Sequence, residues 1–93
     1  MNRNYFISYD LFAPGQSYDA VIAAIKKFNG WAKVHKSFWY VHTPLSVDQV
    51  FQQVWNAMDK NDSLMVVDIA NKTAKWINID PAAAKYIQDH WSK

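Results

Sequence analysis

The chain has 93 residues, a formal net charge of +2 and no cysteine. This length fits a single domain, and the missing cysteines exclude disulfides, thiol catalysis and cysteine-ligated zinc. No apolar run approaches the roughly 20 residues that span a bilayer, and a strand-like pattern already begins at Tyr5, so we expect a cytoplasmic protein without a signal peptide or a membrane partner.

The charge is unevenly distributed along the chain. Residues 1–36 carry Arg3, Lys26, Lys27, Lys33 and Lys36 against two aspartates, a balance of 5 − 2 = +3. The remainder carries five lysines against six aspartates, 5 − 6 = −1. One side of the molecule is therefore expected to be mildly basic, although ordinary solvated lysines on helix and loop surfaces would give the same pattern.

The first predicted strand, residues 5–11, is rich in β-branched and aromatic side chains. Its alternation puts four apolar residues on one face, namely Tyr5, Ile7, Tyr9 and Leu11. The opposite face carries Phe6, Ser8 and Asp10. Asp10 is thus expected at the C-terminal end of the strand, on the face turned away from the core.

A helix is predicted next, from Tyr18 to about Phe28. Ser17 is a candidate N-cap, and Asn29-Gly30 is expected to end the helix. Its apolar residues recur at helical spacing: Val21, Ile22, Ile25 and Phe28. Residues 31–43 then favour two short strands that reverse near residues 35–37.

A second helix is predicted to begin at Ser46. Ser46 and Gln49 have the spacing of a capping box, and Leu45 and Val50 have that of a hydrophobic staple. The expected buried stripe consists of Val47, Val50, Phe51, Val54 and Met58. The polar run at residues 59–63 is expected to end this helix.

Two strands and a short helix complete the predicted elements. Residues 64–69 and 74–79 favour strands, joined by a turn at Asn71-Lys72. Asp80-Pro81 is typical of a helix start. The last helix is expected to carry Ala84, Ile87 and Trp91 along one side.

The order of the elements predicts an α+β, ferredoxin-like βαββαβ sandwich with an additional C-terminal strand and a short helix. Residues 1–93 are expected to form one domain, with a core and the extra strand in residues 1–79 and the helix in residues 80–93. Two helices on one face of an antiparallel sheet leave the other face open. We expect function at this open face.

Three short motifs in this order resemble the CRISPR-associated protein 2 superfamily, which includes the VapD interferases and stand-alone SinR-like relatives. These are Tyr9-Asp10 ending the first strand, Lys36-Ser37-Phe38 entering a middle strand, and Asp62-Ser63 opening the fourth, within residues 4–79. The resemblance implies a homodimer joined through the open sheet face. Some members are magnesium-dependent endonucleases or endoribonucleases, and others are non-catalytic nucleic-acid scaffolds.

The resemblance also implies roles for particular residues. Asp10 matches the catalytic, metal-binding aspartate, and two copies facing each other could hold Mg²⁺ and activate a water. The residues expected at the dimer interface are Phe6, Ser8, Phe38, Tyr40 and Trp76. Those expected to contact the phosphates of RNA or DNA are Lys26, Lys27, Lys33 and Lys36. Alternatively, Asp10 only ends the strand before the Pro14-Gly15 turn.

Other interpretations remain open. The chain lacks glutamate and has Trp39 and Tyr40 where the family often has an acidic residue. The alternative function is that of a dimeric interaction or scaffold module without nuclease activity. Residues 36–41 partly imitate the strand of an RNA-recognition motif, whose aromatic residues stack on bases. His35, His42 and Asp68 form a weaker candidate for a metal cluster or an acid-base pair.

Overall fold

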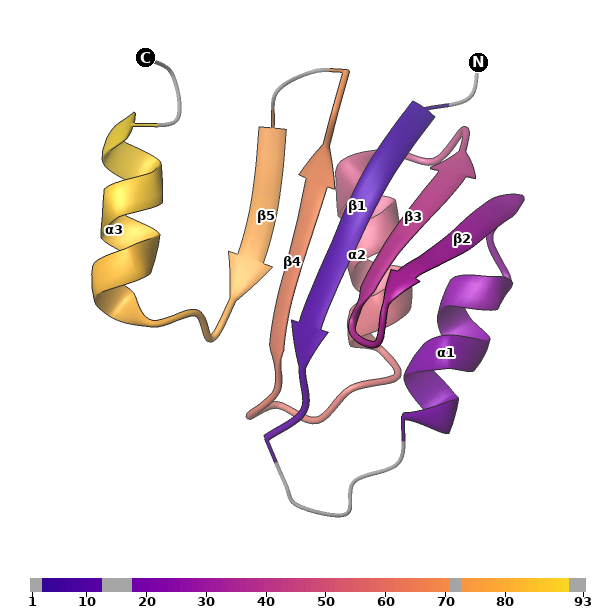
Figure 1. Cartoon of the computed structure of the whole chain (residues 1–93), viewed down its shortest axis with the longest axis horizontal. Coiled ribbons are helices and arrows are strands. Elements are labelled where there is room, and N and C mark those ends of the chain that lie inside the picture. The colour runs from indigo at the N-terminus through magenta and orange to yellow at the C-terminus, as the bar shows by residue number, and fades with distance from the viewer. Residues whose placement is uncertain (1–2, 13–17, 71–72, 91–93) are drawn as a thin grey trace.

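The computed structural model describes residues 3–12, 18–70 and 73–90 (Figure 1). Five strands and three helices follow one another as β1 (Arg3–Asp10), α1 (Asp19–Lys26), β2 (Gly30–His35), β3 (Phe38–Thr43), α2 (Val47–Trp55), β4 (Ser63–Asp68), β5 (Thr73–Ile77) and α3 (Pro81–His90). The order of the first six elements is the predicted one, and β5 and α3 follow them as expected.

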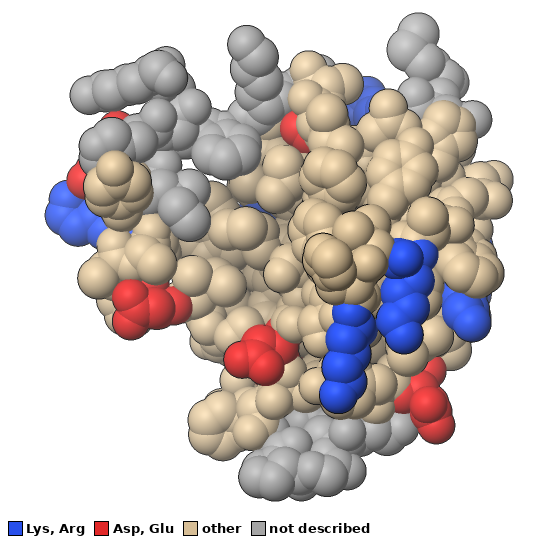
Figure 2. Space-filling model, in the orientation of Figure 1, with Lys and Arg blue, Asp and Glu red and all other residues tan. Residues whose placement is uncertain are grey.

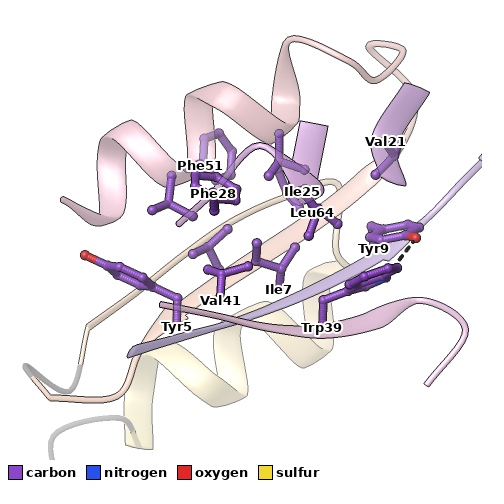
Figure 3. Close-up of a cluster of buried hydrophobic side chains, with 13 residues drawn as sticks. Tyr5, Ile7, Tyr9, Val21, Ile25, Phe28, Trp39, Val41, Phe51 and Leu64 are labelled. Carbon is purple, nitrogen blue, oxygen red and sulfur yellow. Dashed lines mark hydrogen bonds between the residues drawn. The ribbon is translucent and has the colours of Figure 1, made fainter. Parts of the chain in front are cut away.

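The strands form one antiparallel sheet in the order β2-β3-β1-β4-β5. The chain is therefore a small α+β protein, and this order is compatible with the predicted ferredoxin-like class. The close-up in Figure 3 shows α1 and α2 on one side of the sheet. We call the other side the open face. α3 lies beyond the β5 edge in Figure 1 and on the side away from α1 and α2 in Figure 3.

The core lies between the sheet and the two helices (Figure 3). Tyr5, Ile7 and Tyr9 of β1 are buried, as their alternation predicts. They meet Val21 and Ile25 of α1 in the same cluster. The other buried members are Phe28, Trp39, Val41, Val50, Phe51, Val54, Leu64 and Val66.

Helix α1 is shorter than the sequence predicts. It ends at Lys26 because Lys27 and Phe28 donate their N–H groups to Ala24 and Ile25, three residues back, which tightens the last turn before Asn29. This turn directs Phe28 into the core. The predicted N-cap, Ser17, lies outside the described residues, and the residue before α1 is Tyr18.

The predicted start of α2 is confirmed. The Ser46 hydroxyl accepts the Gln49 N–H at 3.2 Å, and the Gln49 side-chain oxygen accepts the Ser46 N–H at 2.8 Å. Val50 is buried in the core, and Leu45 is partly buried against it. These contacts fix where the chain enters the helix that packs against β4 and β5.

The predicted reversal between β2 and β3 is also confirmed, at Lys36-Ser37. Strand β4 begins and ends one residue earlier than expected, and β5 ends at Ile77 because Asn78 has a φ of 58° and leaves the extended conformation. The predicted Asn71-Lys72 turn lies outside the described residues.

Helix α3 begins at Pro81, as predicted. The Asp80 carboxylate accepts the Ala83 N–H at 3.1 Å and thus caps the helix. Ala84 is half-buried, whereas Tyr86 is 66% exposed. The side chains of Ile87 and Trp91, which we expected beside Ala84, are not among those that the structure describes.

Candidate functional site

The open face carries a cluster of aromatic side chains on the two central strands. Phe6 of β1 stacks on Phe38 of β3, with ring centroids 5.2 Å apart, and meets the edge of Tyr40 at 6.3 Å. All three are half-buried in the single chain. The structure therefore brings together three of the five residues expected at a dimer interface.

Apolar residues of β4 and β5 extend this surface. Cross-strand pairing places Ser8 beside both Phe38 and Met65, and Met65 beside Trp76. Ser8 is exposed, and Trp76 is half-buried. We name as the sheet patch the half-buried set Phe6, Phe38, Tyr40, Met65, Val67 and Trp76. Figure 2, in which α2 lies behind the sheet, shows charged side chains mainly towards the rim and an uncharged surface between them.

Met65 and Val67 were absent from the predicted interface. Their alternation with the buried Leu64 and Val66 is a signal that could have included them. Because residues 64–67 form a continuous apolar run, their residue types do not distinguish the core-facing positions from those on the open face.

Asp10 is exposed at the end of β1, on the open face and paired with Ser63 of β4. This is the predicted position. Among the described residues, no three His, Cys, Asp or Glu side chains gather closely enough to hold a metal ion. In the described part of the chain, Asp10 thus lies at the rim of the sheet patch and belongs to no group of three such side chains.

A buried carboxylate beyond the predicted set holds the chain next to Asp10. Asp62 accepts the Phe12 N–H and the Asp59 N–H, each at 2.8 Å, and is completely buried. Asn78 joins the same region by donating to the carbonyl oxygens of Lys60 and Asp62. This network ties three loops together at the end of the sheet where Asp10 lies.

The four predicted phosphate-binding lysines are all exposed. Three of them lie against aromatic rings: Lys26 Nζ is 4.9 Å from the Trp31 centroid, Lys33 Nζ is 6.0 Å from that of Trp39, and Lys36 Nζ is 5.4 Å from that of Tyr18. Lys27 follows the end of α1. The three ring contacts follow β2 from its start to just beyond its end, so these lysines lie along one side of the molecule.

Trp31 is a surface residue that the predicted site did not include. It is 44% exposed although it projects to the helix side of the sheet, where it meets Trp39 at 5.7 Å between ring centroids. Strand alternation marks that side of β2 as core-facing, but it does not show where the helix layer stops. The exposure of Trp31 could not be read from the sequence for this reason.

His35, His42 and Asp68 are not brought together as a metal cluster. Asp68 is buried on the core side and accepts the Ala70 N–H at 3.1 Å, so it stabilises the turn that follows β4. His42 lies on the open face, 3.1 Å from the Asn4 side-chain oxygen. Asn4 also accepts the Tyr40 hydroxyl at 2.5 Å. These polar contacts order the end of the open face that is distant from Asp10.

None of the described helices is long and apolar enough to cross a membrane. Comparisons with protein-family models, curated proteins and solved structures found no match for this chain. Its function has to be inferred from the arrangement of its own residues.

Proposed function

We propose that this chain is a homodimeric, CRISPR-associated-protein-2-like protein of the ferredoxin-like fold that engages nucleic acid. The observation that carries the proposal is the sheet patch, with Asp10 at its rim. The order of the elements, with β1 central between β3 and β4, supports the fold. The exposed lysines on the α1 and β2 side support the nucleic-acid partner.

A second copy of the same chain is the partner that suits the sheet patch. The patch is apolar, half-buried and spread over four neighbouring strands. Aromatic residues and methionine are enriched at the centres of protein interfaces, where charged residues are depleted. A two-fold axis through such a patch buries identical surfaces against each other. Asp10 of one copy and Asp10 of the other then come to the same interface.

Two Asp10 carboxylates could together supply a magnesium site. Mg²⁺ prefers oxygen ligands and keeps several waters, and it is often held by one or two carboxylates plus a substrate phosphate. Bound there, Mg²⁺ would supply a nucleophilic water and stabilise charge on the scissile phosphate. This arrangement is that of an endoribonuclease or endonuclease, with Asp10 as the metal ligand and the lysines as phosphate contacts.

A non-catalytic scaffold is the second candidate function, since no group of three metal-ligating side chains includes Asp10 among the described residues. Within the described part of the chain, Asp10 has no companions that complete a metal site. In a dimer whose two Asp10 residues lie far apart, the sheet patch would still form the interface and the lysines would still bind phosphates. Magnesium-dependent cleavage would be absent. The two candidates therefore share the dimer and differ only at Asp10.

A cleavage assay distinguishes the two candidates. Purified protein is incubated with single-stranded RNA and with duplex DNA, with and without Mg²⁺, beside Asp10→Asn and the control Asp89→Asn, which removes an exposed carboxylate of α3. For the nuclease, cleavage requires Mg²⁺, is lost in Asp10→Asn and persists in Asp89→Asn. If the wild type and both variants bind nucleic acid but none of them cleaves it, the protein is the non-catalytic scaffold. Equal cleavage by Asp10→Asn and the wild type refutes the role of Asp10.

A further inference from the structure

Trp31 and two of the lysines form a distinct surface, which we call the Trp31 edge: Trp31, Lys26 and Lys33. Trp31 is the second residue of β2, an edge strand of the sheet. Its ring packs against Trp39 at 5.7 Å with an interplanar angle of 57°, so Trp39 supports it from the core side. The indole nevertheless remains 44% exposed. It is a large aromatic ring held on the surface by a fully buried one.

The Trp31 edge lies on the helix side of the sheet. Trp31 pairs with Val41, and Lys33 pairs with Trp39, both of which face the core. Directly paired residues of antiparallel strands project to the same face. The contact between Lys26 of α1 and the Trp31 ring agrees with this direction. A dimer closed through the sheet patch would therefore leave the Trp31 edge accessible.

The chemistry of this surface suits a flexible nucleic-acid strand. Proteins that bind single strands combine a basic surface along the backbone with aromatic rings on which unpaired bases stack. In a duplex the bases already stack on one another and cannot reach a protein ring in this way. A contact between an ammonium and an exposed ring is weak. Lys26 can therefore turn from the Trp31 ring to a phosphate and free the ring for a base.

We propose that the Trp31 edge binds single-stranded nucleic acid, with Trp31 stacking on one base and with Lys26 and Lys33 contacting the neighbouring phosphates. The inference rests on the proposed function, since it names the class of nucleic acid that the lysine side of the molecule takes. It assigns to Trp31 the part of the binding energy that distinguishes a single strand from a duplex. It requires no role for Asp10.

The test measures the binding of fluorescent oligouridylate, and of duplex DNA of the same length, by fluorescence anisotropy. The wild type should bind the single strand more tightly. Trp31→Ala should lose about tenfold or more of this affinity, Trp31→Phe should retain most of it, and Tyr86→Ala, which removes an exposed ring of α3, should lose none. The logarithm of the binding constant falls linearly with the logarithm of the salt concentration, and Lys26→Ala and Lys33→Ala should each reduce the magnitude of this slope by about 0.7.

A second measurement on the unaltered protein guards against misfolding, because Trp31 also contacts Trp39. The indole N–H resonance of Trp31, assigned by its loss in Trp31→Phe, should shift when oligouridylate is added. An unshifted resonance, equal affinity for single strand and duplex, or undiminished binding by folded Trp31→Ala overturns the inference. If binding then still falls in the two lysine variants, the proposed function stands; if the wild type binds neither oligonucleotide, both fail.

Discussion

Asp62 and Phe12 are joined by a hydrogen bond that fixes the chain just beyond Asp10. The Phe12 N–H donates to the Asp62 carboxylate at 2.8 Å, although the two residues are 50 positions apart. Phe12 follows Asp10 by two residues, so this contact restrains the backbone next to the candidate metal ligand. The precision of the site thus depends on a buried side chain of a distant loop.

Asp62→Asn should destabilise the protein by about 2 kcal/mol. An asparagine offers one acceptor oxygen, whereas the two carboxylate oxygens of Asp62 accept separate N–H groups from Phe12 and Asp59. Urea denaturation gives the free energy of unfolding. Asp59→Asn is the matched control, because this side chain is exposed and Asp59 joins the network through its backbone N–H and carbonyl oxygen. Equal stability of the two variants would contradict the role of Asp62.

Phe38→Lys should convert the proposed dimer into a monomer. Phe38 stacks on Phe6 within the sheet patch, and a lysine there would bring an unpaired charge into the interface. We expect at least a tenfold rise in the dimer dissociation constant, measured by sedimentation equilibrium. Val34→Lys, at an exposed apolar residue of β2, should leave the dimer intact. If the wild type is monomeric at micromolar concentration, the proposed dimer is wrong.

The stability of the protein should decline at alkaline pH through Tyr9. Burial raises the pKa of the Tyr9 hydroxyl above the ordinary 10.0, despite a hydrogen bond from Trp39 that acts in the opposite direction. Below pH 10.0, the ordinary pKa, the hydroxyl is protonated in both the folded and the unfolded chain, and Tyr9 makes its full contribution to the free energy of unfolding. Above it the unfolded chain ionises first, so the free energy of unfolding falls until the pH passes the raised pKa.

Tyr9→Phe should flatten this alkaline decline. Because the Tyr9 hydroxyl also bonds to Trp39 and to the Lys36 carbonyl oxygen, we expect the variant to lose about 1 kcal/mol near neutral pH. Urea midpoints measured across the alkaline range test both effects. Tyr86→Phe, at an exposed position, should keep the wild-type profile. An unchanged slope in Tyr9→Phe would assign the decline to another group.

Ser46→Ala should cost about 1 kcal/mol by removing the N-cap of α2. The Ser46 hydroxyl and the Gln49 side chain each accept the backbone N–H of the other residue. A double-mutant cycle with Gln49→Ala measures their coupling by thermal or urea unfolding. We expect the loss in the free energy of unfolding in the double variant to differ from the sum of the losses in the two single variants. Strict additivity would show that the two bonds act independently.

The fold was largely predictable because short local patterns in the sequence mark most of its strands and helices. Alternation in β1 identifies the buried Tyr5 and Ile7, and the Ser46-Gln49 pair marks the start of α2. The end of α1 was less predictable: the expected stop at Asn29-Gly30 is preceded by a tightened turn that no residue type signals. The position of β5 beside β4 could not be derived from periodicity alone, since it depends on which sheet edge is free.

The candidate site was predictable only in part. The position of Asp10 on the open face follows from strand alternation and was predicted correctly. The role of Asp62 depends on the N–H group of Phe12 in the loop after β1, as well as on that of Asp59 in its own loop. The exposure of Trp31 depends on how far α1 extends over β2. Both are properties of packing between distant segments, which spacing along the chain does not encode.

The first strand of the chain lies in the middle of the sheet, between β3 and β4. In a nascent chain that has emerged only as far as Thr43, β1 can pair with β3 on one side. Its other edge stays unpaired until residues 63–68 of β4 have emerged. Backbone pairing of β1 is thus completed only after residues 63–68 have been synthesised. A fragment that stops before β4 would carry an uncovered strand edge and should tend to aggregate.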